Sequence, residues 1–140
     1  MPGNNKNSFN HLKIHTQYSI CEGALKIEDL KSYCKKNKVQ SVGLSDTSNL
    51  CGALEFAENL SKIGTQPIIG TQINFKYKEM IGLMPLFAMN ISGYKRIIEL
   101  SSKSYLENND SSEPHCDYSE LTKNNNDIAI FSGTVDGLIG

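Results

Sequence analysis

The 140-residue sequence predicts an α/β domain with a largely parallel sheet. Short apolar runs typical of strands alternate with segments whose apolar residues recur at helical spacing. The expected order of elements is β-α-β-α-β-β-α-α-β. A content of 39% hydrophobic and 21% charged residues suits one folded domain of this size.

The first three elements form a strand–helix–strand unit. Apolar and polar residues alternate over residues 9–15, which predicts a strand. Acidic residues in the first turn and apolar residues at helical spacing predict a helix over residues 25–36. A short apolar run then predicts a second strand over residues 41–46.

The middle of the chain is expected to contain a helix and two strands. Ser48 or Asn49 is a suitable cap for a helix over residues 50–63. The expected inner face of this helix has three apolar residues, Leu54, Ala57 and Leu60. Two apolar runs predict strands over residues 66–75 and 79–89.

The last third of the chain begins with a helix over residues 92–105, for which Ser92 is the expected cap. Residues 107–114 are rich in Asn, Asp and Ser, which predicts a surface loop. A short helix over 117–123 and a strand over 127–132 follow. The series stops at five strands with no helix behind the last one, so we expect an incomplete sheet rather than a closed barrel.

The charge distribution argues against a nucleic-acid surface on this chain. The net charge is -1, and the only arginine among thirteen lysines is Arg96. Binding to nucleic acid depends on a basic face, and recognition of phosphates or bases commonly uses Arg forks.

Four cysteines lack CxxC spacing, so neither a zinc ribbon nor a thioredoxin-like site is expected, and the thiols should stay reduced in the cytoplasm. Residues 1–8 are polar and lack the apolar core of a signal peptide. No apolar run is long enough to span a bilayer. We therefore expect a disordered N-terminus over 1–8 and a cytoplasmic protein without membrane contact.

Four ordered segments carry a family pattern: residues 11–19 read HLKIHTQYS, 43–53 read GLSDTSNLCGA, 66–73 read QPIIGTQI and 86–94 read LFAMNISGY. Together they resemble the N-terminal PHP (polymerase and histidinol phosphatase) domain in the alpha subunits of bacterial DNA polymerase III. The likeness runs from about residue 9 to residue 140. No single segment is specific, whereas four in the same order with matching spacing are.

The resemblance implies an incomplete, distorted (β/α) barrel of the seven-stranded, metallo-dependent phosphatase-like type. Residues 9–140 would be the N-terminal part of this PHP domain, and the chain would end before the polymerase domain. We expect His15, Asp46 and Gln72 to lie in one cleft, because each is placed at the carboxyl end of a parallel strand.

In an intact member of the family, imidazoles and carboxylates at the strand ends hold metal ions that activate water and clamp a phosphate. The resemblance places seven positions of this chain there: Lys13, His15, Glu22, Asp46, Thr47, Gln72 and Leu83. Lys13, Thr47 and Leu83 stand where the family has His, and Gln72 stands where it has Glu.

A lysine brings a cation where a cation should bind, and Gln removes a ligand charge. Only His15 and Glu22 remain as donors, and a zinc site needs three or four. We therefore expect a vestigial site with no catalytic residue and no bound metal, where the ancestral site would have held Zn or Mn. Lys13 is expected to form an ion pair with Glu22 in place of the metal.

The remaining polar residues have plainer interpretations. His15 is expected to be a hydrogen-bonding remnant, His11 a partly buried structural residue, and His115 an exposed residue of the loop. Asp46 is expected to cap the turn after its strand by accepting backbone N–H groups.

The resemblance also implies a function. The parent would be the replicative DNA-directed DNA polymerase III alpha subunit, a nucleotidyltransferase that uses Mg and contacts DNA through its other domains. We expect this fragment alone to be inactive in DNA replication. It would be a structural domain that docks the proofreading 3'-5' exonuclease (epsilon) subunit and other holoenzyme subunits.

Two alternatives remain open. The chain could be an active metal-dependent phosphoesterase or 3'-5' exonuclease of the same family, against which the lost ligands argue. It could also be a stand-alone binding module unrelated to replication, against which the incomplete sheet argues.

Overall fold

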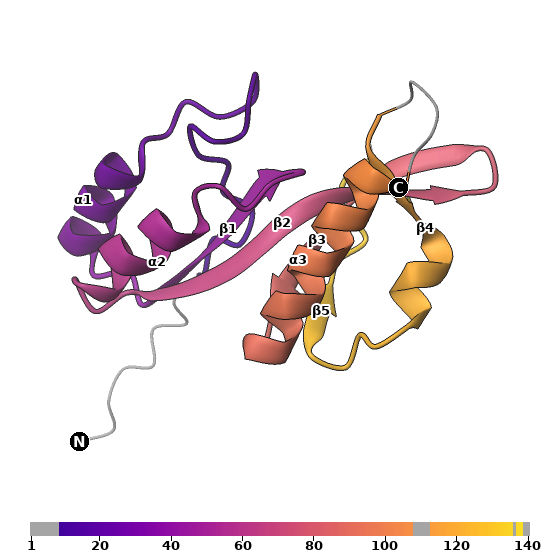
Figure 1. Ribbon diagram of the computed structural model, residues 1–140. Coiled ribbons are helices and arrows are strands. Elements are labelled where there is room, and N and C mark those ends of the chain that lie inside the picture. The colour runs from indigo at the N-terminus through magenta and orange to yellow at the C-terminus, as the bar shows by residue number, and fades with distance from the viewer. Residues whose placement is uncertain (1–8, 108–112, 136, 139–140) are drawn as a thin grey trace.

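The computed structural model describes residues 9–107, 113–135 and 137–138, and it is an α/β arrangement around a five-stranded sheet (Figure 1). The elements in chain order are α1 (Ile27–Asn37), β1 (Ser41–Thr47), α2 (Ala53–Ser61), β2 (Gln66–Tyr77), β3 (Met80–Ala88), α3 (Ile91–Leu106), β4 (His115–Asp117), the 3-10 helix η1 (Tyr118–Thr122) and β5 (Ile128–Ile130). The predicted fold class is confirmed. The predicted disorder of residues 1–8 and most of the predicted loop over 107–114 lie outside the described residues.

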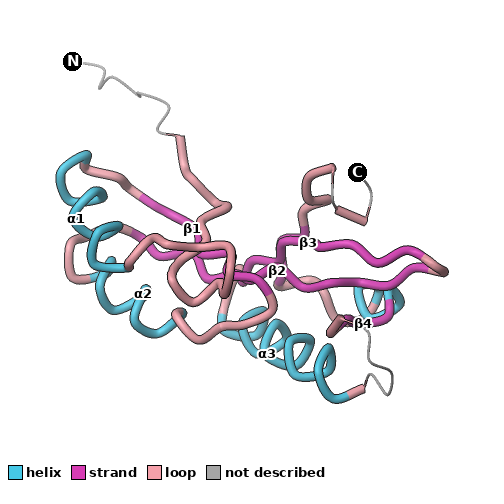
Figure 2. The backbone as a smooth tube through the Cα atoms, turned by 90° about the horizontal axis from the view of Figure 1, so that it is seen from above, coloured by secondary structure: helices cyan, strands magenta, loops and turns pink. Residues whose placement is uncertain are grey.

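Strand β2 is the centre of the sheet and has neighbours along both edges. Its first half pairs in parallel with β1, and its second half pairs in parallel with the short strand β4 along the same edge. On its other edge it pairs antiparallel with β3, which pairs antiparallel with β5. Figure 2 shows β2 and β3 running side by side as a long ribbon.

The sheet is therefore mixed, and the expectation of a largely parallel sheet is wrong. Only Lys78 and Glu79 separate β2 from β3. A connection this short can only return the chain antiparallel, because a parallel neighbour requires a crossover of a dozen or more residues.

Two hydrophobic clusters lie along β2, one toward each end. The first joins α1, α2 and β1 through Leu30, Leu44 and Phe56, and the second joins β2, β3 and α3 through Phe75, Leu86 and Ile97. Figure 1 shows α1 and α2 at one end of the long strand and α3, β4 and β5 at the other. The carboxyl end of β1 thus lies where the two halves meet.

The inner face of α2 differs from the prediction. Ala53, Phe56 and Leu60 are buried, which is the i, i+3, i+7 pattern of one helix face, whereas Leu54 is 71% exposed. Ala57 lies at the edge of this face and is half-buried.

The predicted helix caps are also wrong. Gly52 occupies the cap position of α2, where no side chain accepts a capping hydrogen bond. Helix α3 begins one residue earlier than predicted, and the side chain of Asn90 rather than Ser92 accepts the hydrogen bond from Gly93 N–H at 3.0 Å.

The predicted first strand is reduced to isolated contacts along β1. Gly43 N–H donates to the His11 carbonyl at 2.7 Å, Ser45 N–H donates to the Ile14 carbonyl at 2.9 Å, and Ile14 forms a parallel bridge with Leu44. The approach is close because Gly43 has no side chain. A Cβ atom there would stand 2.8 Å from the Leu12 backbone.

Strand β4 was not predicted, and it changes the place of His115. This residue pairs with Asn74 of β2 and is only 9% exposed, so the expectation of an exposed loop histidine is wrong. Its ring Nδ1 lies 2.8 Å from the Glu113 carbonyl oxygen.

No helix in the described part of the chain is long and apolar enough to cross a membrane.

The single arginine fastens η1 to α3. Arg96 is 9% exposed and donates to the Glu120 carboxylate at 3.1 Å and to the Glu120 carbonyl at 3.0 Å. Lys103 and Lys123 bind the same carboxylate at 3.0 and 2.9 Å. Hydrogen bonds from Lys123, Lys103 and Arg96 lower the pKa of Glu120 to about 2.

This network predicts a pH-dependent stability. A carboxyl group whose pKa falls on folding stabilises the fold above its unfolded pKa and loses that contribution as pH falls toward its folded pKa. Glu120→Gln should therefore lower the free energy of unfolding by roughly 1–3 kcal/mol at pH 7. In urea titrations at pH 3, the free energies of unfolding of this variant and of wild type should differ by less than at pH 7. Glu58→Gln, on the exposed face of α2, is the matched control; an equal loss there would contradict the assignment.

Candidate functional site

A cavity of about 200 Å³ lies where the carboxyl end of β1 meets the middle of β2 and β3. Its lining brings together side chains from distant parts of the sequence, Lys13, His15, Glu22, Gln72, Leu83 and Thr134. The strand registers explain this gathering. Thr47 lies opposite Gln72, and Leu83 lies opposite Asn74 two residues farther along β2. Five of the seven predicted site positions therefore line one cavity.

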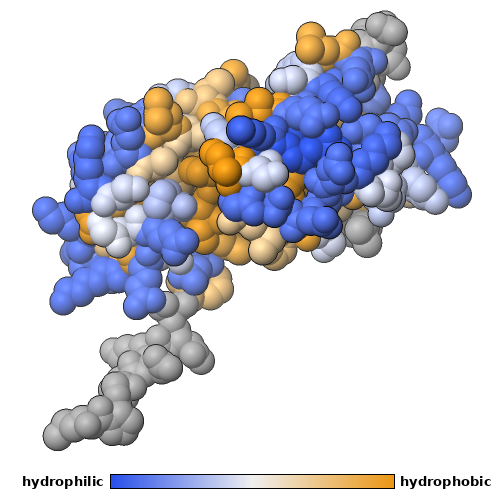
Figure 3. All heavy atoms as spheres, turned by 60° about the horizontal axis from the view of Figure 1, so that its bottom comes forward, coloured by the Kyte–Doolittle hydropathy of each residue, from blue (hydrophilic) through white to orange (hydrophobic). Residues whose placement is uncertain are grey.

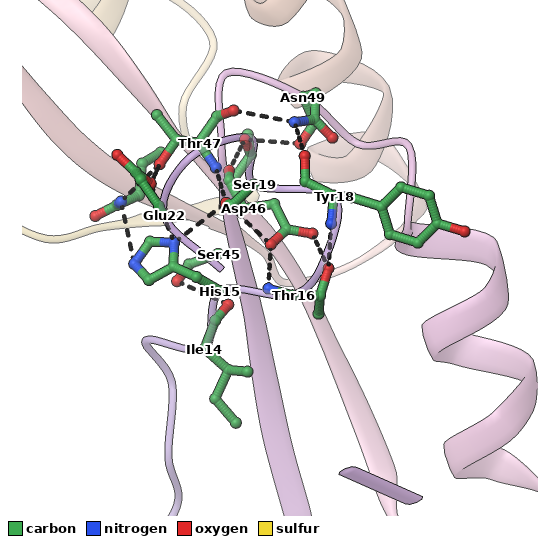
Figure 4. A network of polar contacts seen from close by, with 12 residues as sticks. Ile14, His15, Thr16, Tyr18, Ser19, Glu22, Ser45, Asp46, Thr47 and Asn49 are labelled. Atoms are coloured by element: carbon green, nitrogen blue, oxygen red, sulfur yellow. Dashed lines mark hydrogen bonds and ion pairs between the residues drawn. The ribbon is translucent and has the colours of Figure 1, made fainter. Parts of the chain in front are cut away.

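Polar contacts link His15 and Glu22 of this cavity to Thr47 (Figure 4). The Thr47 hydroxyl donates to the Glu22 carboxylate at 2.5 Å, and the Gln72 amide donates to the Thr47 hydroxyl at 3.3 Å. The same Gln72 nitrogen lies 3.5 Å from His15 Nε2, and His15 Nδ1 lies 3.7 Å from the Glu22 carboxylate. Thr47 and Gln72 thus contact Glu22 and His15, the two residues predicted to be the remaining donors.

The expected ion pair between Lys13 and Glu22 does not form. Lys13 lines the same cavity, but among the described residues the basic side chain within 4 Å of the Glu22 carboxylate is His15, whose Nδ1 lies 3.7 Å away. The carboxylate is held toward Thr47 by a short hydrogen bond, which positions it on the His15 side.

Asp46 lies behind the cavity and is fully buried. Its carboxylate accepts from the Thr16 N–H at 2.6 Å, the Thr16 hydroxyl at 2.7 Å and the Ser19 hydroxyl at 3.1 Å. These partners belong to the loop that follows residues 9–15, not to the turn after β1. Asp46 therefore does not cap the turn that was predicted. Asn49 serves that turn instead, accepting the Cys51 N–H at 3.0 Å.

Ser19 links Asp46 to the cavity. Its hydroxyl oxygen lies 3.4 Å from His15 Nδ1 and accepts the Thr47 N–H at 2.9 Å (Figure 4). The predicted cluster is therefore correct for His15 and Gln72, which line the cleft, and partly correct for Asp46, which supports it from behind. Thr16, Ser19 and Thr134 were not predicted, although Thr16 and Ser19 belong to the HTQYS segment.

The other predicted histidine lies apart from the site. His11 is exposed, and its ring packs edge-on against Phe9 with the ring centroids 4.7 Å apart. The expectation of a partly buried structural role for His11 is wrong.

The family model described as the PHP domain matches residues 11–140 of this chain. The chain belongs to the PHP domain family. It is 34% identical over 133 residues to the DNA polymerase III subunit alpha of Rickettsia felis, an alignment that covers 94% of this chain and 11% of that protein. It is 35% identical over 145 residues to the DNA polymerase III subunit alpha of Borreliella burgdorferi, covering 96% of this chain and 13% of that protein. The chain thus spans about a tenth of the length of these relatives.

Among solved structures, a Bifidobacterium adolescentis protein described as a candidate metal-dependent phosphoesterase matches with a TM-score of 0.52 at 22% identity. The match covers 68% of this chain and 32% of that chain. At this identity the likeness shows the fold alone, a partial, distorted barrel of the PHP type.

The donor set of this PHP domain does not fit a zinc or manganese centre. Within the described ranges, no group of three or more His, Cys, Asp or Glu residues could hold a metal ion. Both ring nitrogens of His15 already face neighbours, Nδ1 toward Ser19 and Glu22, and Nε2 toward the Gln72 amide nitrogen. Lys13 and Leu83 add a cation and an apolar side chain to the lining, and neither is a ligand for these metals.

A second, larger groove of about 730 Å³ lies between α2 and the start of α3. Figure 3 shows apolar surface gathered between the two hydrophilic ends of the molecule. Leu54, Ile68 and Phe87 are typical of its lining, which has one titratable residue, Tyr94. The groove therefore offers apolar contact area rather than acid–base chemistry.

Proposed function

We propose that this chain is a non-catalytic PHP domain of a replicative DNA polymerase III alpha subunit. Its role is structural, and it docks the proofreading exonuclease (epsilon) subunit and other subunits of the holoenzyme. The observation that carries this proposal is the cavity itself, where Lys13, Gln72 and Leu83 stand beside His15 and Glu22 and the Thr47 hydroxyl binds the Glu22 carboxylate. By the family resemblance these are the metal-ligand positions, and they offer only His15 and Glu22 as donors.

The framework around the lost donors supports the same proposal. Asp46 is fully buried and still fastens the loop at Thr16 and Ser19 to β1 through three hydrogen bonds. A domain that keeps this hydrogen-bonded framework but has few metal donors is suited to a structural and docking role. The match to polymerase alpha subunits over 94% of this chain supports the replication context.

The activity of the whole polymerase belongs to the parts of such a subunit beyond this domain. Nucleotidyl transfer, the Mg that it uses and the contacts with DNA are assigned to those parts, and the setting is the cytoplasm. An active phosphoesterase or 3'-5' exonuclease is disfavoured, because its chemistry needs metal-activated water and the donors for two metal ions.

The proposal predicts binding without hydrolysis. The chain should form a complex with the exonuclease subunit of its own organism in size-exclusion chromatography and calorimetric titration. With zinc or manganese added, it should release no phosphate from a generic phosphate ester and no nucleotide from a DNA 3' end. His15→Ala is the control for any residual activity. Hydrolysis that disappears in His15→Ala would contradict the non-catalytic role, and failure to form the complex would contradict the docking role.

A further inference from the structure

The end of the molecule opposite the cavity carries a group of lysines. Helices α1 and α2 lie side by side there, and each ends just before the strand that follows it, β1 or β2 (Figures 1 and 2). The two connections are tied together, because the Thr65 hydroxyl donates to the Val39 carbonyl at 2.9 Å. Four exposed lysines from the two helix ends therefore share one edge of the molecule, which we call the lysine edge: Lys35, Lys36, Lys38 and Lys62.

The net charge of -1 conceals a separation of charge along these two helices. The acidic residues in their first turns, Glu28 and Asp29 in α1 and Glu55 in α2, lie at the opposite helix ends from the lysines. The ion pairs among the described residues include none of the four lysines. One exposed acid, Glu58, lies a single turn before Lys62 on α2. The lysine edge is therefore positively charged, although the whole chain is not.

The ends of the two helices do not themselves require all of this charge. Cations in the last turn of a helix favour its carboxyl end, which accounts for Lys35 and Lys36. Lys38 follows α1 with a left-handed backbone (φ 52°, ψ 45°), where glycine is the usual residue. Lys62 ends α2 through its backbone N–H, which donates to the Glu58 carbonyl at 3.3 Å and does not use the side chain. The ammonium groups of Lys38 and Lys62 are thus not needed to end these helices.

An exposed aromatic side chain adjoins the lysine edge. Tyr33 is 53% exposed on α1 and precedes Lys36 by one turn, so the two side chains lie on the same side of the helix. Docked proteins usually depend on a buried centre of several aromatic, apolar or Arg side chains. A single-stranded nucleic acid needs only cations along its phosphates and an aromatic face for a base. One tyrosine among lysines favours the nucleic acid over an acidic protein.

We propose that the lysine edge binds a single-stranded nucleic acid without sequence preference. The four lysines neutralise phosphates, and the ring of Tyr33 stacks on a base. Lysine is sufficient for this task, because binding to the phosphate backbone requires point charges rather than the bidentate forks of Arg. The proposal goes beyond the docking role and does not depend on it, since this surface and the cavity lie at opposite ends of β1.

The test is a fluorescence-anisotropy titration of the full chain with a labelled oligothymidylate of about 20 nucleotides, repeated over a series of salt concentrations with a chelator present. The logarithm of the binding constant should fall with the logarithm of the salt concentration at a slope of about -2 to -3, because each neutralised phosphate of a single strand contributes about -0.7. Removing two charges by Lys36→Gln with Lys38→Gln should make this slope less steep by about 1 to 1.5.

A second pair, Lys35→Gln with Lys62→Gln, should give the same change and keeps the test available if the first pair does not fold. The matched control is Lys78→Gln with Lys95→Gln, which removes two exposed lysines at the turn after β2 and on α3 and should leave the slope unchanged. Tyr33→Leu should weaken binding about fivefold or more at every salt concentration without changing the slope.

Each outcome decides the question. An equal change of slope in the control pair and in the pairs of the lysine edge would overturn the proposal, as would the absence of saturable binding by the wild type at low salt. Equal affinity for a polyglutamate peptide of similar charge would assign the edge to an acidic protein instead. Unchanged affinity in Tyr33→Leu would overturn the stacking and, with it, the preference for a single strand.

Discussion

Asp46→Ala is expected to lower the free energy of unfolding by about 2–4 kcal/mol, which is a large share of the stability of a small domain. The carboxylate is fully buried and accepts three hydrogen bonds, from the Thr16 N–H, the Thr16 hydroxyl and the Ser19 hydroxyl. Alanine would leave these donors buried without an acceptor, and a buried unpaired donor costs about 1–3 kcal/mol.

The measurement is urea unfolding of wild type and variant at neutral pH, followed by circular dichroism. Asp29→Ala is the control, because Asp29 is an exposed carboxylate in the first turn of α1 and should change stability by about 0.5 kcal/mol or less. The stability loss of Asp46→Asn should lie between those of Asp46→Ala and Asp29→Ala, because the amide keeps the size of the side chain and one acceptor oxygen. A midpoint for Asp46→Ala within error of wild type would show that this carboxylate does not hold the loop.

The loop that Asp46 fastens contains His15 and Glu22, so its release should also change the cavity. Ser19 is the connection, because its hydroxyl contacts Asp46 at 3.1 Å, His15 at 3.4 Å and the Thr47 N–H at 2.9 Å. The NMR signal of the His15 ring is therefore expected to move in Asp46→Asn and not in Asp29→Ala. The buried carboxylate of Asp46 is therefore expected to support both the stability of the fold and the geometry of the cavity.

The helices and the long strands could be predicted because each carries its own local signal. The apolar spacing in α1 and the apolar runs of β2 and β3 give these elements within a few residues of their observed bounds. Strand β4 could not be predicted in this way. It has three residues, and its parallel pairing with Asn74 depends on β2 extending beyond the end of β1.

The family pattern predicted which residues lie at the site, but it did not predict which of them contact one another. The pattern placed Lys13, His15 and Gln72 correctly in one cavity. Which of them would contact Glu22 depended on the position of the Thr47 hydroxyl, and a hydrogen bond between side chains 25 residues apart leaves no signal in spacing. A similar limit applies to Asp46, whose partners lie on a loop 30 residues earlier.

Placing the side chains of the family pattern at the four substituted positions is expected to have a large effect on metal binding. The substitutions Lys13→His, Thr47→His, Gln72→Glu and Leu83→His together add three imidazoles and a carboxylate to His15 and Glu22, and they remove the one cation. Wild type should show no saturable uptake at micromolar metal, since two donors that already contact each other cannot complete the shell of zinc or manganese. The variant should bind the metal at least about a hundredfold more tightly than wild type. Several ligands are added, and each tenfold gain in affinity corresponds to about 1.4 kcal/mol of binding free energy.

Calorimetric titration measures this effect, and manganese is the more discriminating probe. Cys21 and Cys51 are exposed thiols that can bind zinc outside the cavity, whereas manganese prefers oxygen and nitrogen ligands. Adding His15→Ala to the restored variant should weaken binding again, because His15 would be one of the ligands. Micromolar manganese binding to the wild type that His15→Ala abolishes would contradict the vestigial assignment. A restored variant that folds but binds no tighter than wild type would show that the side chains lining this cavity do not converge on a common metal position.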